Sequence, residues 1–321
     1  MCQDGAIELS TRVRQRLLDR SKKVTGFWRT LLSCRILQNI HYRIQHRTKF
    51  TTMVLTPDNS GISRLVGDNS SENITLAPGQ LASFPGGLWM LGGNDTVRGA
   101  SDAERIFGND GKDSLLGGAG SDSIYGGKED DDVLGENGED FLTGDRNSDF
   151  LDGGAGNDLL RGGQGIDLLV GGDGNDTLIG DRDVDIYKGG GGSDVFVFRV
   201  DQAGIRVFGV EVPDAVIVDF DKSSDSIGIS VEFTSSNISF EQVSYSLNDP
   251  RLLLIDSTAI AGGTSLLAKG GISPQSLDPD GNGRVEATNI RFGFANALLG
   301  TVLNATPADL NGRVISANSV L

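Results

Sequence analysis

Carboxylate side chains recur at a fixed interval along the middle of the sequence. Counted in nines from residue 90, twelve consecutive units hold an acidic residue at the sixth place. Carboxylate oxygens are hard donors that suit calcium, so the spacing predicts repeated binding of a hard cation. The candidate ligands are Asp113, Asp122, Asp131, Asp140, Asp149, Asp158, Asp167, Asp176, Asp185 and Asp194, with Asp95 and Glu104 as weaker candidates in units that depart from the pattern.

Glycines and apolar residues at other places of the unit must position these carboxylates. A typical unit begins Gly171-Gly172-Asp173-Gly174-Asn175-Asp176-Thr177-Leu178. The glycines supply backbone that can take positive φ, so each unit contains a sharp turn. The eighth place is apolar or aromatic in all twelve units, from Val97 to Phe196, and it must point inward. Two units, with two turns and two short strands, then make one coil, and we expect six stacked coils.

The stacking brings like charges together. Sixth-place residues two units apart return to the same edge, so Asp113 lies near Asp131, and Asp122 near Asp140, in two rows. Two carboxylates about 5 Å apart repel by roughly 1 kcal/mol in water and about 3 kcal/mol at an effective dielectric of 20. Eight such pairs would cost on the order of 10 to 25 kcal/mol, against a total stability of about 5 to 15 kcal/mol for a typical domain. We therefore expect calcium ions between the carboxylates.

The unit Gly-Gly-x-Gly-x-Asp-x-U-x, where U is a large apolar residue, resembles the repeat of the RTX, or haemolysin-type, calcium-binding proteins. The resemblance covers residues 90–198. It implies an all-β fold with a parallel β-roll, in which each calcium ion lies between two turns of one edge. The ligands would be both sixth-place aspartates and intervening backbone carbonyls. Glu129, Asn147 and Asp183 replace the fourth-place glycine, and Glu129 adopts left-handed backbone least readily.

The charge distribution is uneven. Residues 1–52 carry 11 Lys/Arg against 3 Asp/Glu, whereas the rest of the chain carries 17 against 41. The strongly acidic composition of residues 53–321 argues against a nucleic-acid partner and favours binding of cations. From Met53 onward there is no cysteine and no histidine, which excludes disulfides, Cys/His zinc sites and a histidine base from that portion. The sequence also has no run of about 18 uncharged apolar residues that would predict a transmembrane segment.

The basic arm of residues 1–52 has two interpretations. Apolar residues at helical spacing among arginines are typical of a helical membrane-surface or nucleic-acid arm. It lacks the apolar core and cleavage site of a secretory signal. Charge, glycine, cysteine and histidine content all change at Met53, which favours Met53 as the true start. The intact mass of the natural protein would decide between the two.

Both flanks of the repeats are expected to be β-rich caps. Residues 53–89 alternate short apolar groups with turn residues, and a solenoid needs its first coil covered. Residues 199–321 contain extended segments at 215–220, 226–229, 239–245 and 252–255. They resemble the closing segment of serralysin-type C-terminal domains. RTX proteins also carry a C-terminal secretion signal, which the resemblance places near the end of this segment.

A second oxygen-rich loop lies within the C-terminal cap. Asp278, Asp280 and Asn282 stand at places one, three and five of an EF-hand-like loop, with glycine at place six. Place twelve is Asn289, where that loop requires a bidentate glutamate. The loop predicts either a further calcium site or a plain Asp/Gly turn.

The resulting functional expectation is a secreted, non-enzymatic calcium-binding protein. Its roll would fold on calcium uptake after passage through a type I exporter, giving an extracellular location with possible cell-surface association. One alternative is a calcium-rigidified, adhesin-like surface component. A further alternative is an accessory module of an RTX enzyme, although the chain has no His-Glu-x-x-His and no Gly-x-Ser-x-Gly motif.

Overall fold

The computed structural model describes residues 54–57, 63–200, 206–207, 210–211, 213, 215–231, 237–246, 266–293 and 297–317. The predicted arm of residues 1–52 lies outside them. Within the described part the chain is all-β, with two large sheets, a two-stranded ribbon and short helices. Among these residues no helix is long and apolar enough to cross a membrane.

Sheet A has the order β1-β2-β4-β6-β8-β10-β12-β14-β16-β20-β24. Its strands are β1 (Val54–Pro57), β2 (Ser63–Val66), β4 (Leu88–Trp89), β6 (Arg105–Asp110), β8 (Ser123–Lys128), β10 (Phe141–Arg146), β12 (Leu159–Gln164), β14 (Thr177–Arg182), β16 (Val195–Phe198), β20 (Ser226–Ile229) and β24 (Val314–Ser316).

Sheet B has the order β3-β5-β7-β9-β11-β13-β15-β19-β23-β22-β21. Its strands are β3 (Asn73–Thr75), β5 (Thr96–Arg98), β7 (Ser114–Ala119), β9 (Asp132–Asn137), β11 (Phe150–Ala155), β13 (Leu168–Asp173), β15 (Asp185–Gly191), β19 (Ala215–Ile217), β23 (Ala297–Leu303), β22 (Arg284–Phe292) and β21 (Ile238–Ser246). The remaining elements are β17 (Arg206–Val207), β18 (Val210–Glu211), α4 (Leu266–Lys269), α5 (Pro274–Leu277) and α6 (Pro307–Leu310).

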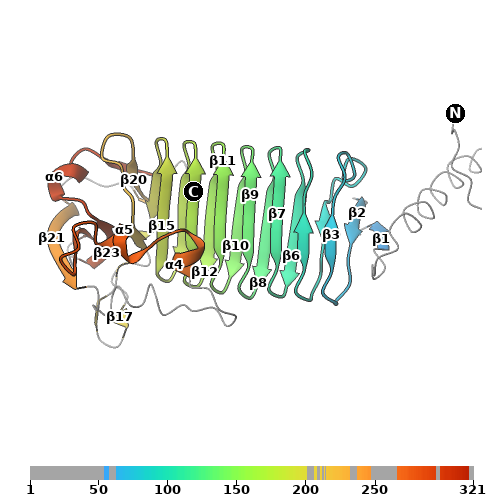
Figure 1. The fold of residues 1–321 in the computed structure, drawn as a ribbon, viewed down its shortest axis with the longest axis horizontal. Helices are drawn as coiled ribbons and strands as arrows, with labels where there is room; N and C mark the ends of the chain where they lie inside the picture. Colours follow the sequence, from blue (N-terminus) through green and yellow to red (C-terminus); the bar gives the residue numbers. More distant parts are fainter. Residues whose placement is uncertain are drawn as a thin grey trace, which may run out of the picture. The chain divides into compact units, whose positions relative to one another are not determined.

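Consecutive strands of the repeats enter opposite sheets, so each strand pairs in parallel with the strand two places later in the chain (Figure 1). Leu142 of β10 aligns with Leu160 of β12, and Leu151 of β11 aligns with Leu169 of β13. In both pairs, the two leucines occupy the eighth place of their units, and the two units are separated by one other unit in the sequence. The predicted parallel β-roll with two units in each coil is therefore confirmed.

The eighth-place side chains form the core between the sheets. All twelve are at most 1% exposed and belong to one continuous hydrophobic cluster. Full burial of each aliphatic member contributes roughly 1.5–3 kcal/mol. Tyr187 is the one member with a polar group, and its hydroxyl accepts from the N–H of Gly180 and donates to the carbonyl of Val197. An unbroken apolar column thus holds the coils in register.

The turns between strands use left-handed backbone. Glu129, Asn147 and Asp183, which replace the fourth-place glycine, have φ angles of 74°, 74° and 75°. A residue with a Cβ is strained in this region, and asparagine and aspartate tolerate it better than glutamate does. These three positions thus keep a positive φ, whereas the fourth-place glycines have larger values of 111–149°, and Glu129 is the most strained of the three.

Aromatic side chains stack along the outer face of sheet A. Trp89 and Phe107 have ring centroids 4.3 Å apart, and Phe107 and Tyr125 have centroids 4.6 Å apart. The guanidinium of Arg64 lies 4.5 Å from the centre of the Trp89 ring. Offset stacking and cation–π contacts of this kind stabilise neighbouring strands beyond the area they bury.

The C-terminal segment continues both sheets. In sheet A, β16 pairs in parallel with β20, and β20 with β24. In sheet B, β15 pairs with β19 and β19 with β23, after which β22 and β21 complete an antiparallel edge. The strands predicted within residues 215–220, 226–229 and 239–245 are present as β19, β20 and β21. The strand predicted at 252–255 lies outside the described residues.

Helix α4 covers part of the outer face of sheet B. Leu267 packs in one hydrophobic cluster with Phe150 and Leu168, which project outward from β11 and β13. Lys269 forms an ion pair with Asp132 of β9. Figure 1 shows α4 in orange over the strands of the repeats. The C-terminal segment is thus packed against the roll as well as stacked on its end.

Candidate metal centre

The sixth-place carboxylates are hydrogen-bonded from one coil to the next. The backbone N–H of Asp113 donates to Oδ1 of Asp131, and the N–H of Asp122 donates to Oδ1 of Asp140, both at 2.7 Å. Equivalent bonds of 2.7–3.0 Å run the length of the repeats. They form two rows. The Asp131 row comprises Asp95, Asp113, Asp131, Asp149, Asp167 and Asp185, and the Asp140 row comprises Glu104, Asp122, Asp140, Asp158, Asp176 and Asp194.

The second oxygen of these carboxylates is buried. In every member of the two rows except Asp185, that oxygen is shielded from solvent and has no hydrogen-bond partner among the described residues. Folded proteins rarely leave buried polar atoms unpaired, because each one costs the desolvation free energy of that group. The repetition of this arrangement in two aligned rows indicates a ligand that compensates the buried charge.

The first-place glycines leave room around these oxygens. A Cβ on Gly153 would lie 2.4 Å from Oδ2 of Asp158 and 2.5 Å from the carbonyl oxygen of Gly171, one coil further on. Gly108 and Gly135 have the same surroundings. A residue with a side chain therefore cannot replace glycine at the first place. Carboxylate and carbonyl oxygens converge on most of the first-place glycines, and this donor set suits a hard cation.

Side chains alone do not complete such a site. Within the described residues, no three aspartate, glutamate, histidine or cysteine side chains form a group that could hold a metal ion. A cation bound in either row must therefore use backbone carbonyls in addition to one or two carboxylates. Calcium accepts this mixed oxygen coordination, since it takes six to eight oxygen ligands in flexible geometry.

Comparison with known families supports this assignment. The family model of the RTX calcium-binding nonapeptide repeat, which spans four copies of the repeat, matches residues 91–115, 98–133, 107–142, 125–160, 134–169 and 161–196. The chain carries RTX calcium-binding nonapeptide repeats. No curated protein matches this chain.

Burial changes the protonation of the RTX rows. Desolvation raises the pKa of Asp131 to about 9, and desolvation together with the Asp167 charge raises the pKa of Asp149 to about 10. In the Asp140 row, desolvation raises the pKa of Asp140 and that of Asp194 to about 6. Without a cation, the middle of the Asp131 row therefore holds protons at neutral pH. Calcium must displace these protons when it binds.

The two weaker candidates of the RTX repeats lie in the rows with the others. The N–H of Asp95 donates to Oδ1 of Asp113 at 2.8 Å, and the N–H of Glu104 donates to Oδ1 of Asp122 at 2.7 Å. One carboxylate oxygen of each is buried and unpartnered among the described residues. The longer side chain of Glu104 is thus accommodated in the same position as an aspartate.

The EF-hand-like loop is separate from the RTX rows. The carboxylate of Asp278 accepts hydrogen bonds from the N–H groups of Asn282 and Gly283, and that of Asp280 accepts from the side-chain amide of Asn282. Asn289, at place twelve, lies in β22, where its side-chain oxygen accepts from Tyr245 and Thr301. The loop's oxygens therefore bind the loop itself in this structure, and its calcium site stays a prediction.

Two carboxylates outside the count of nine join the rows. The N–H of Glu72 donates to Oδ1 of Asp95 at 2.7 Å, and the N–H of Asp194 donates to Oδ1 of Asp225 at 3.0 Å. Neither residue follows from the repeat pattern, because their spacings from the rows are 23 and 31 residues. The signal that could have found them is an acidic residue two positions before a buried isoleucine, Ile74 or Ile227.

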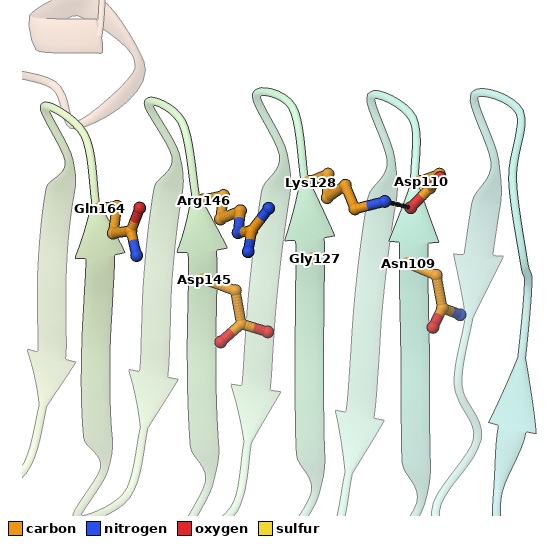
Figure 2. Close-up of a pocket in the computed structure, with 7 residues that line it drawn as sticks. All are labelled: Asn109, Asp110, Gly127, Lys128, Asp145, Arg146 and Gln164. Carbon is orange, nitrogen blue, oxygen red and sulfur yellow. Dashed lines mark ion pairs between the residues drawn. The ribbon is translucent and has the colours of Figure 1, made fainter.

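A shallow groove lies on the outer face of sheet A, away from the carboxylate rows (Figure 2). Its volume is about 420 Å³. Lys128 and Asp110 form an ion pair of 2.7 Å along it. The lining residues are Asn109, Asp110, Gly127, Lys128, Asp145, Arg146 and Gln164. They come from the second and third places of the units, so the groove contains none of the buried carboxylates.

Proposed function

We propose that each row binds several calcium ions, and that the roll becomes stable only when they are bound. The observation that carries this proposal is the series of buried, unpartnered carboxylate oxygens along both rows. Neighbouring sixth-place carboxylates and the carbonyls beside the first-place glycines would hold each ion. The ion supplies positive charge that compensates the desolvated carboxylates.

The stabilisation follows from linkage. An ion that binds only the folded roll adds RT ln(1 + [Ca]/Kd), or about 1.4 kcal/mol per site at tenfold excess over Kd. Because the sites are repeated, small contributions add along the roll. In a compartment with little calcium the roll would remain unfolded, and it would fold where calcium is abundant.

We further propose that the protein is secreted and acts outside the cell without enzymatic activity. Two features support this. A fold conditional on calcium suits passage through a type I exporter as an unfolded chain, and the resemblance to RTX proteins implies that route. The residues from Met53 onward also lack histidine and cysteine, which removes two common catalytic side chains from the roll and its caps.

A calcium titration tests the central proposal. Far-UV circular dichroism and isothermal titration calorimetry should record cooperative gain of β structure together with binding of several ions per chain. Magnesium at the same concentration serves as the control, since it demands octahedral geometry and retains its waters. A full β signal in excess chelator would contradict the calcium-conditional fold.

The adhesin-like surface role remains as an alternative. It is favoured by the continuous parallel pairing of the strands, which makes the calcium-loaded roll a stiff spacer. Fractionation and pull-down from intact cells would distinguish a surface-held protein from a released one. A role as an accessory module of an RTX enzyme would require a catalytic partner to be recovered in the same pull-down.

A further inference from the structure

Residues 67–75 form a short segment upstream of the matched repeats. They read Gly67-Asp68-Asn69-Ser70-Ser71-Glu72-Asn73-Ile74-Thr75. Asp95 is the sixth-place residue of the following coil, and it lies 23 positions after Glu72. Two repeat units would give a spacing of 18, so the segment does not fit the nine-residue count. The contacts of the segment nevertheless match those of a repeat unit, place by place.

The strand and core positions agree with a repeat unit. Ile74 aligns with Val97 across the parallel pair of β3 and β5, and it is 2% exposed within the same cluster as the eighth-place residues. The N–H of Thr96 donates to the carbonyl of Glu72 at 2.8 Å. Ser114 donates to the carbonyl of Asp95 at the same distance one coil later. Ile74 thus takes the eighth place and Glu72 the sixth.

The turn positions agree as well. The N–H of Asn94 donates to the hydroxyl of Ser71 at 2.9 Å, as the N–H of Lys112 donates to the side-chain oxygen of Asn94 at 3.1 Å. Both Ser71 and Asn94 therefore accept a hydrogen bond from a fifth-place N–H of the next coil. Ser71 takes the fifth place, one residue before Glu72.

The surroundings of the carboxylate complete the match. A Cβ on Gly67 would lie 2.6 Å from Oε2 of Glu72 and 3.0 Å from the carbonyl oxygen of Met90. At Gly108 the corresponding distances are 2.3 Å to Oδ2 of Asp113 and 2.5 Å to the carbonyl oxygen of Gly126. Gly67 is therefore a first-place glycine, with a carboxylate oxygen and a first-place carbonyl beside it.

Glu72 has one carboxylate oxygen available. Its side chain is 8% exposed, and Oε1 accepts a hydrogen bond from the N–H of Asp68 at 3.1 Å. Oε2 is buried and has no hydrogen-bond partner among the described residues. Asp95, the next member of the row, has an unpartnered oxygen of the same kind. Two buried acidic groups in successive coils thus lack compensation.

We infer that residues 67–75 are an additional, out-of-register repeat unit, and that Glu72 and Asp95 provide a calcium site at the upstream edge of the matched repeats. The carbonyl of Met90 would contribute a further oxygen. This inference rests on the proposed function of the rows. It places the first ion of the Asp131 row in a segment that the nonapeptide pattern does not reach.

The Asp140 row ends at Asp225, whose carboxylate differs from that of Glu72 in its hydrogen bonds. Oδ1 of Asp225 accepts from the N–H of Asp194 at 3.0 Å, and Oδ2 accepts from the N–H of Asp221 at 2.7 Å. Both oxygens are therefore used by the protein itself. Asp225 ends its row as a hydrogen-bonded cap, whereas Glu72 begins its row with an oxygen free for a cation.

Hydrogen–deuterium exchange of the full chain, followed by mass spectrometry, tests the inference. Calcium should slow exchange in peptides covering residues 67–75 by about tenfold or more, as expected for a site at tenfold excess. E72Q should lose this protection while peptides from residues 108–198 retain theirs. E72D keeps a carboxylate and should behave as the wild type. D68N is the matched control, since Asp68 carries the same charge nearby with its carboxylate bonded to Ser70.

The outcomes separate this inference from the proposed function. Calcium protection of residues 67–75 in E72Q equal to that in the wild type would overturn the site at Glu72. Absence of calcium protection in residues 108–198 of the wild type would instead overturn the proposed function. If E72Q fails to fold in calcium, wild-type crystals soaked in terbium decide the question. An anomalous peak beside Glu72 supports the site, and peaks confined to the matched repeats overturn it.

Discussion

Asp140 and Asp158 are joined across one coil by a hydrogen bond of 2.7 Å from the N–H of Asp140 to Oδ1 of Asp158. The second oxygen of Asp158 is buried and has no hydrogen-bond partner among the described residues. The same carboxylate thus serves the fold with one oxygen and is available to a ligand with the other. This division lets the two roles be separated by mutation.

Asp158→Asn should weaken calcium binding while preserving the fold at saturating calcium. The amide oxygen can still accept from Asp140, but an NH₂ group cannot coordinate a cation. Loss of one site should reduce the free energy of unfolding by about 1.4 kcal/mol at tenfold calcium excess over Kd. Urea denaturation at fixed calcium measures this. Asp173→Asn, at an exposed third place two units further along the chain, is the control and should change little. Equal effects of the two variants would refute the special role of the sixth place.

Without calcium, folding of the roll should become less favourable as pH rises from acid to alkaline. Burial raises the pKa of Asp131 to about 9 and that of Asp149 to about 10, far above the usual range of an aspartate. The folded roll therefore binds more protons than the unfolded chain between the usual and the raised values. The stability that this contributes is complete below about pH 4 and is lost as pH rises through the folded pKa values.

Far-UV circular dichroism in excess chelator at pH 5, 7 and 9 checks this dependence. We expect a partial β signal at pH 5 that falls across the series, and saturating calcium to flatten the fall between pH 7 and 9. Asp131→Asn should also reduce the slope, because it removes one titrating group from the Asp131 row. A chelated roll that gains stability from pH 5 to pH 9 would show that these carboxylates are ionised in the folded state.

Gly153→Ala should be strongly destabilising. Its Cβ would lie 2.4 Å from Oδ2 of Asp158 and 2.5 Å from the carbonyl of Gly171, so the coil or the carboxylate would have to move. Overpacking of this kind typically costs about 1–3 kcal/mol, and the displaced oxygen should also weaken calcium binding. Gly191→Ala is the matched control. The nearest atom to its Cβ would be 3.6 Å away, an ordinary contact. Thermal unfolding in calcium should distinguish the two, and tolerance of both would exclude the close approach.

Glu129→Gly should stabilise the calcium-loaded protein. Glu129 has φ of 74° at an exposed fourth-place position where most units have glycine. Left-handed backbone costs a residue with a Cβ roughly 1–2 kcal/mol, and glycine relieves this at some expense in chain entropy. A net gain of about 1 kcal/mol should appear as a higher urea midpoint. Asn147→Gly should gain less, because asparagine tolerates this conformation. A larger gain at Asn147 than at Glu129 would contradict the argument.

Much of the roll follows from the repeat itself. The count of nine predicts the coil of two units, the inward column that includes Leu142 and Leu151, and the two rows of carboxylates. It works because each unit contacts only its neighbours, so local spacing determines the architecture. The calcium sites at individual residues remain a prediction that the buried oxygens support.

Features that depend on contacts with distant segments of the chain do not follow from the nine-residue pattern. Phe150 and Leu168 stand at outward-facing places, yet they are 7% and 0% exposed because Leu267 packs over them. Glu72 lies outside the count because the stretch between Thr75 and Met90 changes its spacing from the repeats. In both cases the relevant partner is set by tertiary packing and not by the local pattern.

The aromatic stack on sheet A gives the first coils a spectroscopic signature of their own. Trp89 is one of only two tryptophans in the chain, and its ring centre lies 4.3 Å from that of Phe107, with Tyr125 next in line. Transition dipoles held this close couple, so near-ultraviolet ellipticity should report the ordering of β4, β6 and β8. The assembly of the N-terminal coils can therefore be timed without an added label.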